Sequence, residues 1–359
     1  MELDGLRSRV IEETGRPEPT CPKHMVYGPC GGVRVDERCE VDDRPCPFVH
    51  APTVRWTGPP PPRSTATTTA TIGEVLGRPP GEPIIITDLR VRPFDRRSIE
   101  HVTATLSAAS DAVLVGEHHT RPDFPPTLMA AIIAEAGGRA WVTLTCRDRN
   151  RVVLESELAG LAAINAAGVH CVTGDARAPS VRDDATQVFD LDSTRLVALA
   201  RHTGMFVSVA ATPTAPPLDQ RPRRLGEKVR AGAQACFVNH AGGSAGVARF
   251  ATAVRRAGVD VALIPCVAVF TDVESLLVLE RFPGLVVDPD TRRAVLDARD
   301  GRSTGMTAAI AEAERMLAID GVVGINLSGS ATSGSETDSA AIMADISVEL
   351  RLRRVSRSR

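Results

Sequence analysis

Four cysteines near the start of the chain have the side-chain chemistry to bind a metal. They occupy a segment rich in glycine, proline and charge, with the spacing C-x8-C-x8-C-x6-C: Cys21, Cys30, Cys39 and Cys46. Such a segment has too little apolar surface to fold alone, so a metal is a plausible organiser. Thiolates suit zinc and iron–sulfur clusters alike. We expect a four-cysteine site that binds zinc or [4Fe–4S], with four reduced cysteines and no metal as the alternative.

Zinc is the favoured occupant of this four-cysteine site. The sequence offers no second cysteine quartet for an electron relay, because the remaining cysteines are scattered: Cys146, Cys171, Cys236 and Cys266. A closed tetrahedral zinc site would be structural and would hold the segment together. The spacing nevertheless lacks the paired C-x2-C pattern that identifies zinc ribbons.

A second group of candidates consists of carboxylates that follow short, apolar, β-branched runs. These are Asp88, Glu117, Asp148 and Asp175. Carboxylates that share a cleft of low dielectric push each other's pKa apart, which suits general acid–base catalysis. For each one alone, a solvated loop carboxylate or a helix N-cap is the favoured interpretation. They form a catalytic site only if the fold brings the ends of these runs together.

The runs before these carboxylates belong to an alternation of strands and helices. Amphipathic stretches, several closed by glycine, separate eight expected strands: 84–87, 112–115, 141–145, 169–173, 205–211, 235–238, 261–264 and 322–327. Eight such units match an α/β fold, the (β/α)8 TIM-type barrel, whose active sites lie at the C-terminal ends of the strands. A doubly wound open sheet uses the same alternation and is the alternative.

The 359 residues divide into three expected segments. These are a small N-terminal cysteine-rich, metal-binding module at residues 1–58, a Pro/Thr-rich linker at 59–82 and the barrel at 83–352. The net charge of -2 gives no basic surface for nucleic acid. The sequence has neither a signal-peptide pattern nor an apolar run long enough to cross a membrane. We therefore expect a cytoplasmic protein with no nucleic-acid or membrane partner.

Several stretches resemble the methylenetetrahydrofolate reductase family. The run WVTLTCRDRNRVVLESELAGLAAINAAGVHCVTGD looks like the core of that family's barrel, and FVSVAATP, GEKVRAGAQACFVN and GVDVALIPCV follow in the family's order and spacing. The resemblance covers residues 82–285 well and extends loosely to 350. The cysteine module, with CPKHMVYGPCGG, is similar to a small domain that in this family usually lies C-terminal to the barrel or on a partner subunit. Here it lies N-terminal.

The resemblance implies folate one-carbon metabolism, on the route to methionine. It implies a barrel that holds FAD and reduces 5,10-methylenetetrahydrofolate to 5-methyltetrahydrofolate with NAD(P)H, while an acid protonates the folate nitrogen. Two other hypotheses stay open. One is a flavin-independent reductase or a folate-dependent one-carbon transferase. The other is a catalytically silent accessory subunit that docks a methyltransferase or reductase partner. Oligomer formation is also left open.

The resemblance assigns roles to individual residues. Asp88 falls where the family has its glutamate acid and is one methylene shorter, so Glu117 is the alternative acid. Asp175 matches an aspartate beside flavin and folate, and Lys228 matches a lysine near the cofactor's phosphates. Thr212 stands where many members have a tyrosine that packs on FAD. The remaining assignments are Thr145, Asp148 and Gly174 to the cofactor, and Asn239 and His118 to the folate.

Overall fold

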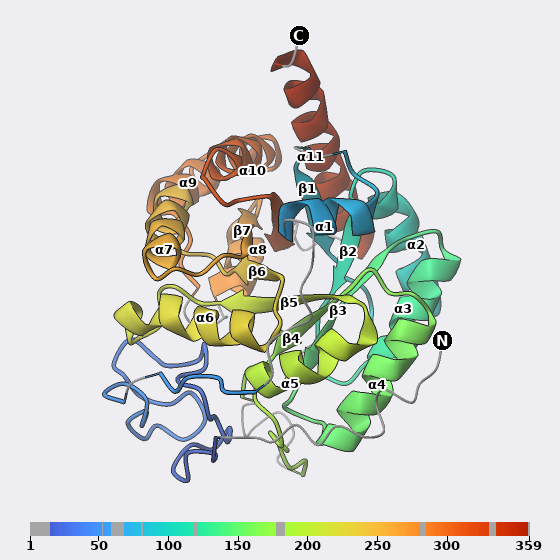
Figure 1. Ribbon diagram of the computed structural model, residues 1–359. Coiled ribbons are helices and arrows are strands. Elements are labelled where there is room, and N and C mark those ends of the chain that lie inside the picture. Colours follow the sequence, from blue (N-terminus) through green and yellow to red (C-terminus); the bar gives the residue numbers. More distant parts are fainter. Residues whose placement is uncertain are drawn as a thin grey trace.

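The chain forms a closed barrel of eight parallel strands (Figure 1). The computed structural model describes residues 15–51, 53–58, 68–79, 82–117, 121–176, 184–280, 285–329 and 335–357, with the backbone alone for 68–71 and 354–357. The strands are β1 (Ile84–Asp88), β2 (Ala112–Val115), β3 (Ala140–Thr145), β4 (Gly168–Val172), β5 (Phe206–Ala211), β6 (Ala235–Val238), β7 (Ala262–Val269) and β8 (Gly324–Gly329). They pair in chain order and β8 closes onto β1. The barrel prediction is confirmed, and the open-sheet alternative is excluded.

Helices follow the strands and cover the outside of the barrel (Figure 1). They are α1 (Thr68–Leu76), α2 (Arg96–Ser107), α3 (Pro126–Glu135), α4 (Arg151–Ala163), α5 (Ser193–Ala200), α6 (Arg221–Ala231), α7 (Ser244–Arg256), α8 (Val273–Glu280), α9 (Pro289–Leu296), α10 (Gly301–Leu317) and α11 (Glu336–Arg357). Of the helices described, none combines the length and apolar character needed to cross a membrane.

Polar side chains at the strand-to-helix turns begin several of these helices. Asp95 accepts a hydrogen bond from the N–H of Ser98 (3.0 Å) at the start of α2. Asn150 accepts one from the N–H of Val153 (3.1 Å) at the start of α4. Such caps satisfy N–H groups that the first helical turn leaves without a partner. Each cap therefore fixes the point at which the loop ends and its helix begins.

Helix α1 closes the end of the barrel at which the strands begin. Its Ile72 and Leu76 are buried in one cluster with residues from the first positions of the strands, among them Ile84, Trp141 and Phe206. The segment 59–82, for which the sequence predicts a linker, thus contains a helix that seals the barrel floor. The polar residues gather at the opposite end, which is called the mouth below.

The N-terminal module, residues 15–58, packs beside α5 and α6 (Figure 1). Tyr27 and Trp56 meet edge to face with ring centroids 5.3 Å apart, and both belong to the buried cluster that fills the space between strands and helices. The backbone N–H of Val26 donates to Asp192 (3.1 Å), and that of Trp56 donates to Glu227 (2.6 Å). Shared aromatic burial joins the module and the barrel into one folded unit.

Candidate functional site

Asp88, the last residue of β1, lies at the mouth beside the end of β8. Its carboxylate accepts a hydrogen bond from the side-chain amide of Asn326 (2.9 Å), and Asn326 is 1% exposed. Burial raises the pKa of Asp88, against the opposing effect of hydrogen bonds from Asn326, Ser328 and the backbone of Gly329. A carboxylic acid that keeps its proton to higher pH is suited to act as a general acid.

Glu117, the alternative acid, is bound by residues at the end of β3 and in the loop that follows it. It accepts hydrogen bonds from the backbone N–H of Thr145 (2.8 Å) and from the guanidinium of Arg149 (2.6 Å). Both ionic partners are largely shielded from solvent, with side-chain exposures of 13% for Glu117 and 16% for Arg149. This ion pair and the bond from Thr145 engage both oxygens of the Glu117 carboxylate. The geometry therefore favours Asp88 as the acid, and Thr145 serves to hold Glu117.

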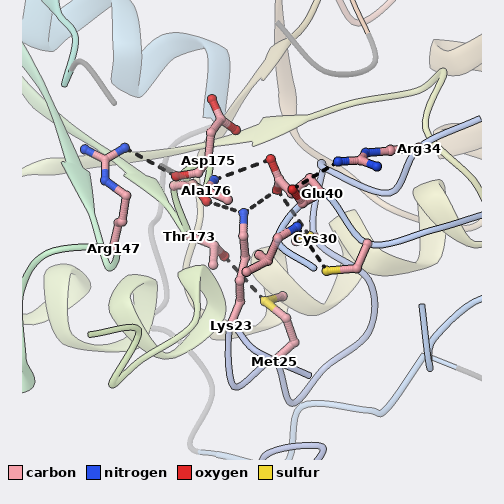
Figure 2. A network of polar contacts seen from close by, with 12 residues as sticks. Lys23, Met25, Cys30, Arg34, Glu40, Arg147, Thr173, Asp175 and Ala176 are labelled. Atoms are coloured by element: carbon pink, nitrogen blue, oxygen red, sulfur yellow. Dashed lines mark hydrogen bonds and ion pairs between the residues drawn. The ribbon is translucent and has the colours of Figure 1, made fainter. Parts of the chain in front are cut away.

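Asp175 stands on a tight turn after β4 (Figure 2). The turn is possible because Gly174 has φ +95°, a conformation that side-chain-bearing residues rarely adopt. Arg147, which is 1% exposed, donates to the carbonyl of Asp175 (3.4 Å) and to the carboxylate of Asp148 (2.8 Å). Within the described part of the chain, the Asp175 carboxylate receives no hydrogen bond, which leaves it available to a ligand.

Lys23 reaches from the N-terminal module to this turn, a placement that no local sequence pattern predicts. Its ammonium group donates to the carbonyl of Gly174 (2.6 Å) and forms an ion pair with Glu40 (Figure 2). Burial alone would lower the pKa of Lys23, but Cys30, Glu40 and Asp175 together raise it above its ordinary value. The only signal in the sequence is that Lys23 is one of two lysines in the chain.

The other residues assigned to FAD or folate contact the module or the barrel itself. The side-chain amide of Asn239 donates to the hydroxyl of Thr212 (3.3 Å), and Gly31 of the module lies directly against that hydroxyl. Lys228 donates to the backbone carbonyl of Ala210 (2.7 Å). Burial lowers the pKa of Lys228 to about 7, assisted by the positive charge of Arg224. His118 lies outside the described residues.

The four module cysteines line one enclosed cavity. Its volume of about 10 Å³ is close to the space that one water molecule needs. Burial raises the pKa of Cys21, Cys30 and Cys46, that of Cys46 to about 11. As arranged, no three metal-binding side chains among the described residues converge closely enough to hold an ion. The metal centre stays a prediction.

Replacing Gly31 with alanine should weaken the docking of the module. A Cβ atom at this position would lie 2.7 Å from the hydroxyl oxygen of Thr212, closer than van der Waals contact permits. We expect the free energy of unfolding, measured with urea, to fall by about 1–3 kcal/mol, as in other overpacked sites. Thr212→Ala removes the obstructing oxygen, so the double variant should regain most of this loss. An equal loss in both backgrounds would show that the module does not rest on the end of β5.

Comparison with solved structures finds a similar fold in another protein. A protein from Clostridium thermocellum, described as binding two copies of 5-methyl-5,6,7,8-tetrahydrofolic acid, superposes with a TM-score of 0.55 at 12% identity, over 77% of this chain and 98% of its own. A 2,3-dimethylmalate lyase of the PEP mutase/isocitrate lyase superfamily gives a TM-score of 0.45 at 12% identity, over 82% of this chain and 88% of its own. The search of curated protein sequences produced no significant match.

Comparison with family models matches the two parts of the chain separately. Residues 10–54, which include all four module cysteines, match a model described as the C-terminal part of methylenetetrahydrofolate reductase. Residues 98–329, from α2 to the end of β8, match the model of methylenetetrahydrofolate reductase itself. This second match spans more than half of the chain and contains the strand ends that carry Glu117, Asp175 and Asn326. The chain therefore belongs to the methylenetetrahydrofolate reductase family.

Proposed function

We propose that this chain is an oxidoreductase of folate one-carbon metabolism, which reduces 5,10-methylenetetrahydrofolate to 5-methyltetrahydrofolate at the mouth of its barrel. The observation that carries the proposal is the desolvated acid Asp88, held by Asn326 at the mouth of a barrel of this family. The Clostridium thermocellum protein, which shares the fold and is described as binding 5-methyltetrahydrofolic acid, supports a folate ligand.

Asp88 is the general acid of the proposed reaction. NAD(P)H, as co-substrate, would supply the hydride that reduces the methylene carbon to a methyl group. The bond between that carbon and one folate nitrogen breaks, and its electron pair stays on the nitrogen. Asp88 donates its proton to this nitrogen and is then reprotonated from solvent. The amide of Asn326, 2.9 Å from the carboxyl oxygen, fixes the direction in which the proton is presented.

The contacts at the mouth favour hydride transfer without a resident flavin. The resemblance assigns Gly174, Thr212 and Lys228 to FAD. The carbonyl of Gly174 accepts from Lys23 (2.6 Å), Thr212 lies against Gly31, and Lys228 bonds to a strand carbonyl (2.7 Å). These residues therefore do not fit FAD in their present arrangement, because the module lies against the turns that follow β4 and β5. We propose the flavin-independent form of the reaction.

Calorimetry with 5-methyltetrahydrofolate tests the folate site. The intact protein should bind the folate, and Asp175→Asn should bind it more weakly, because a carboxylate free to meet the ligand is lost. Absence of any binding heat would refute a folate site. Binding without turnover in the presence of NADH or NADPH would instead support the accessory-subunit hypothesis.

Incubation with FAD tests the flavin-independent form. The purified protein should be colourless and should gain no flavin absorbance after incubation with FAD and removal of the excess. Stoichiometric retention of FAD would contradict this part of the proposal and would restore the flavoprotein hypothesis.

We also propose that the four module cysteines bind one zinc ion. The donors are chemically suitable, all four line one common cavity, and the sequence holds no second cysteine quartet for an electron relay. Elemental analysis should find about one zinc per chain and no iron. A Cys39→Ser variant should lose the metal, whereas Cys236→Ser, a buried barrel position, should keep it. Iron with sulfide, or no metal at all, would contradict the assignment.

A further inference from the structure

The turn that carries Asp175 is held from two directions by buried charged side chains (Figure 2). From the barrel, Arg147 donates to the carbonyl of Asp175 (3.4 Å). From the N-terminal module, Lys23 donates to the carbonyl of Gly174 (2.6 Å), and the carboxylate of Glu40 accepts from the N–H of Ala176 (3.4 Å). Three consecutive residues of the turn thus depend on backbone contacts, and two of these contacts come from the module.

The module side chains that make these contacts are themselves tightly placed. Lys23 and Glu40 form an ion pair with side-chain exposures of 2% and 7%, and the ammonium group also lies 5.3 Å from the ring centre of Phe189. Two buried charges persist only when each satisfies the other and their remaining hydrogen-bonding groups find partners. The backbone of the Asp175 turn provides those partners. The pair and the turn therefore hold each other in place.

The Asp175 carboxylate takes no part in these contacts, which involve only the backbone of residues 174–176. In Figure 2 it points away from Lys23 and Glu40, while these two side chains hydrogen-bond the backbone on either side of it. The positive φ of Gly174 sets the direction of the turn, and a Cβ atom there would come within 3.1 Å of Arg147 and Thr145. A residue whose backbone is fixed and whose functional group is free has the properties expected of a preorganised ligand contact.

We propose that Lys23 and Glu40 are positioning residues for Asp175, so that the N-terminal module completes the folate site of the barrel. The inference rests on the proposed function for the identity of the ligand. The contacts themselves are independent of that identity. Neither residue touches the reacting atoms in this proposal, because each acts through the backbone of residues 174–176.

A double-mutant cycle tests this coupling. Lys23→Met alone would leave Glu40 buried without its partner, so the first variant is K23M/E40Q, which removes both charges together. We expect it to lower turnover of 5,10-methylenetetrahydrofolate with NADH or NADPH by about 100-fold, the effect of a misplacement on the scale of about 1 Å. In a D175N background the same pair of substitutions should cause no further loss. The proposal would be overturned if K23M/E40Q lowered turnover by the same factor in the D175N background as in the unmodified chain. It would also be overturned if K23M/E40Q left the turnover of the unmodified chain unchanged.

Hydrogen exchange supplies a readout that does not depend on the folate. Amides of residues 168–176 should exchange faster in K23M/E40Q than in the unmodified chain, with unchanged exchange in β1 and β8. Unchanged exchange in residues 168–176 would overturn the positioning role of Lys23 and Glu40, even if folate turnover were confirmed. Another outcome is that exchange rises as expected while neither the unmodified chain nor any variant binds folate. In that case only the proposed function fails, and the positioning contacts stand.

Arg38→Met is the matched control within the same module. Arg38 is a cation paired with Asp36 (3.6 Å), and both side chains are more than half exposed. Removing an exposed pair of this kind changes stability by about 1 kcal/mol or less. Turnover and exchange should equal those of the unmodified chain. An effect of R38M as large as that of K23M/E40Q would mean that any damage to the module impairs the site, and the positioning role would be rejected.

Discussion

Replacing Asp88 with asparagine should lower folate turnover by about 100- to 10,000-fold, the range that a general acid contributes. Asparagine keeps the size of the side chain and its contact with Asn326 but has no acidic proton to donate. Binding of 5-methyltetrahydrofolate should change little, because the product needs no protonation. Steady-state rates and calorimetry on the same preparation separate the two effects.

The pH dependence follows from the raised pKa of Asp88. Because burial raises this pKa, the acid stays protonated to higher pH than an ordinary aspartate, and turnover should fall as pH rises through the raised value. The stability that the protonated form contributes is present at low pH and is lost over the same rise. The amide introduced by D88N carries no charge at any pH. The variant should therefore be at least as stable as the unmodified chain at neutral pH. Its residual turnover should not show the fall with rising pH that Asp88 causes.

Glu117→Gln is the comparison for this prediction. The substitution preserves shape and the hydrogen bond from Thr145 while weakening the pairing with Arg149. Turnover should stay within a few-fold of normal. If E117Q shows the large loss expected of D88N while D88N stays active, Glu117 is the acid and Asp88 is a structural residue.

Replacing Asp192 with alanine should lower the free energy of unfolding by about 3–5 kcal/mol, the usual effect of breaking a buried ion pair. Asp192 is wholly buried and caps α5 by accepting from the N–H groups of Thr194 (2.9 Å) and Arg195 (3.0 Å). It also accepts from the N–H of Val26 (3.1 Å) and lies 3.9 Å from the buried guanidinium of Arg224. One carboxylate thus serves a helix, the module and a buried cation.

Asp300→Ala is the matched control, because Asp300 is also an N-cap aspartate but is exposed. It accepts from the N–H of Ser303 (3.1 Å) at the start of α10. Its loss should cost about 1 kcal/mol. Urea denaturation of both variants measures the difference. Similar values for the two would show that Asp192 acts only as a helix cap.

The barrel was predictable from the sequence because its strands are buried on both faces and read as short β-branched runs between amphipathic helices. The strand ends were less predictable. The sequence predicts that the seventh strand ends at Ile264, before a proline that lacks a backbone N–H, but β7 continues through Pro265 to Val269. Helix α1 was missed because it follows a run of threonine and alanine that resembles a linker.

Only those site residues that directly follow a strand could be predicted from the sequence. Asp88, Glu117 and Asp175 follow from the rule that barrel chemistry lies after the strands. The hydrogen bond from Lys23 to Gly174 joins residues 151 positions apart and depends on where the module docks, which no local pattern encodes. Asn326 was missed for a related reason: an asparagine inside an apolar strand shows its role only when β8 is placed beside β1.

A turnover assay with protein freed of flavin tests the proposed reaction most directly. The protein is mixed with 5,10-methylenetetrahydrofolate and NADH or NADPH, and the folates are separated and identified by mass. We expect the unmodified chain to form one 5-methyltetrahydrofolate per reduced nicotinamide consumed, and D88N to form almost none. Product that appears only when FAD is added would contradict the flavin-independent mechanism. No product under either condition would contradict the assignment of this reaction to the barrel.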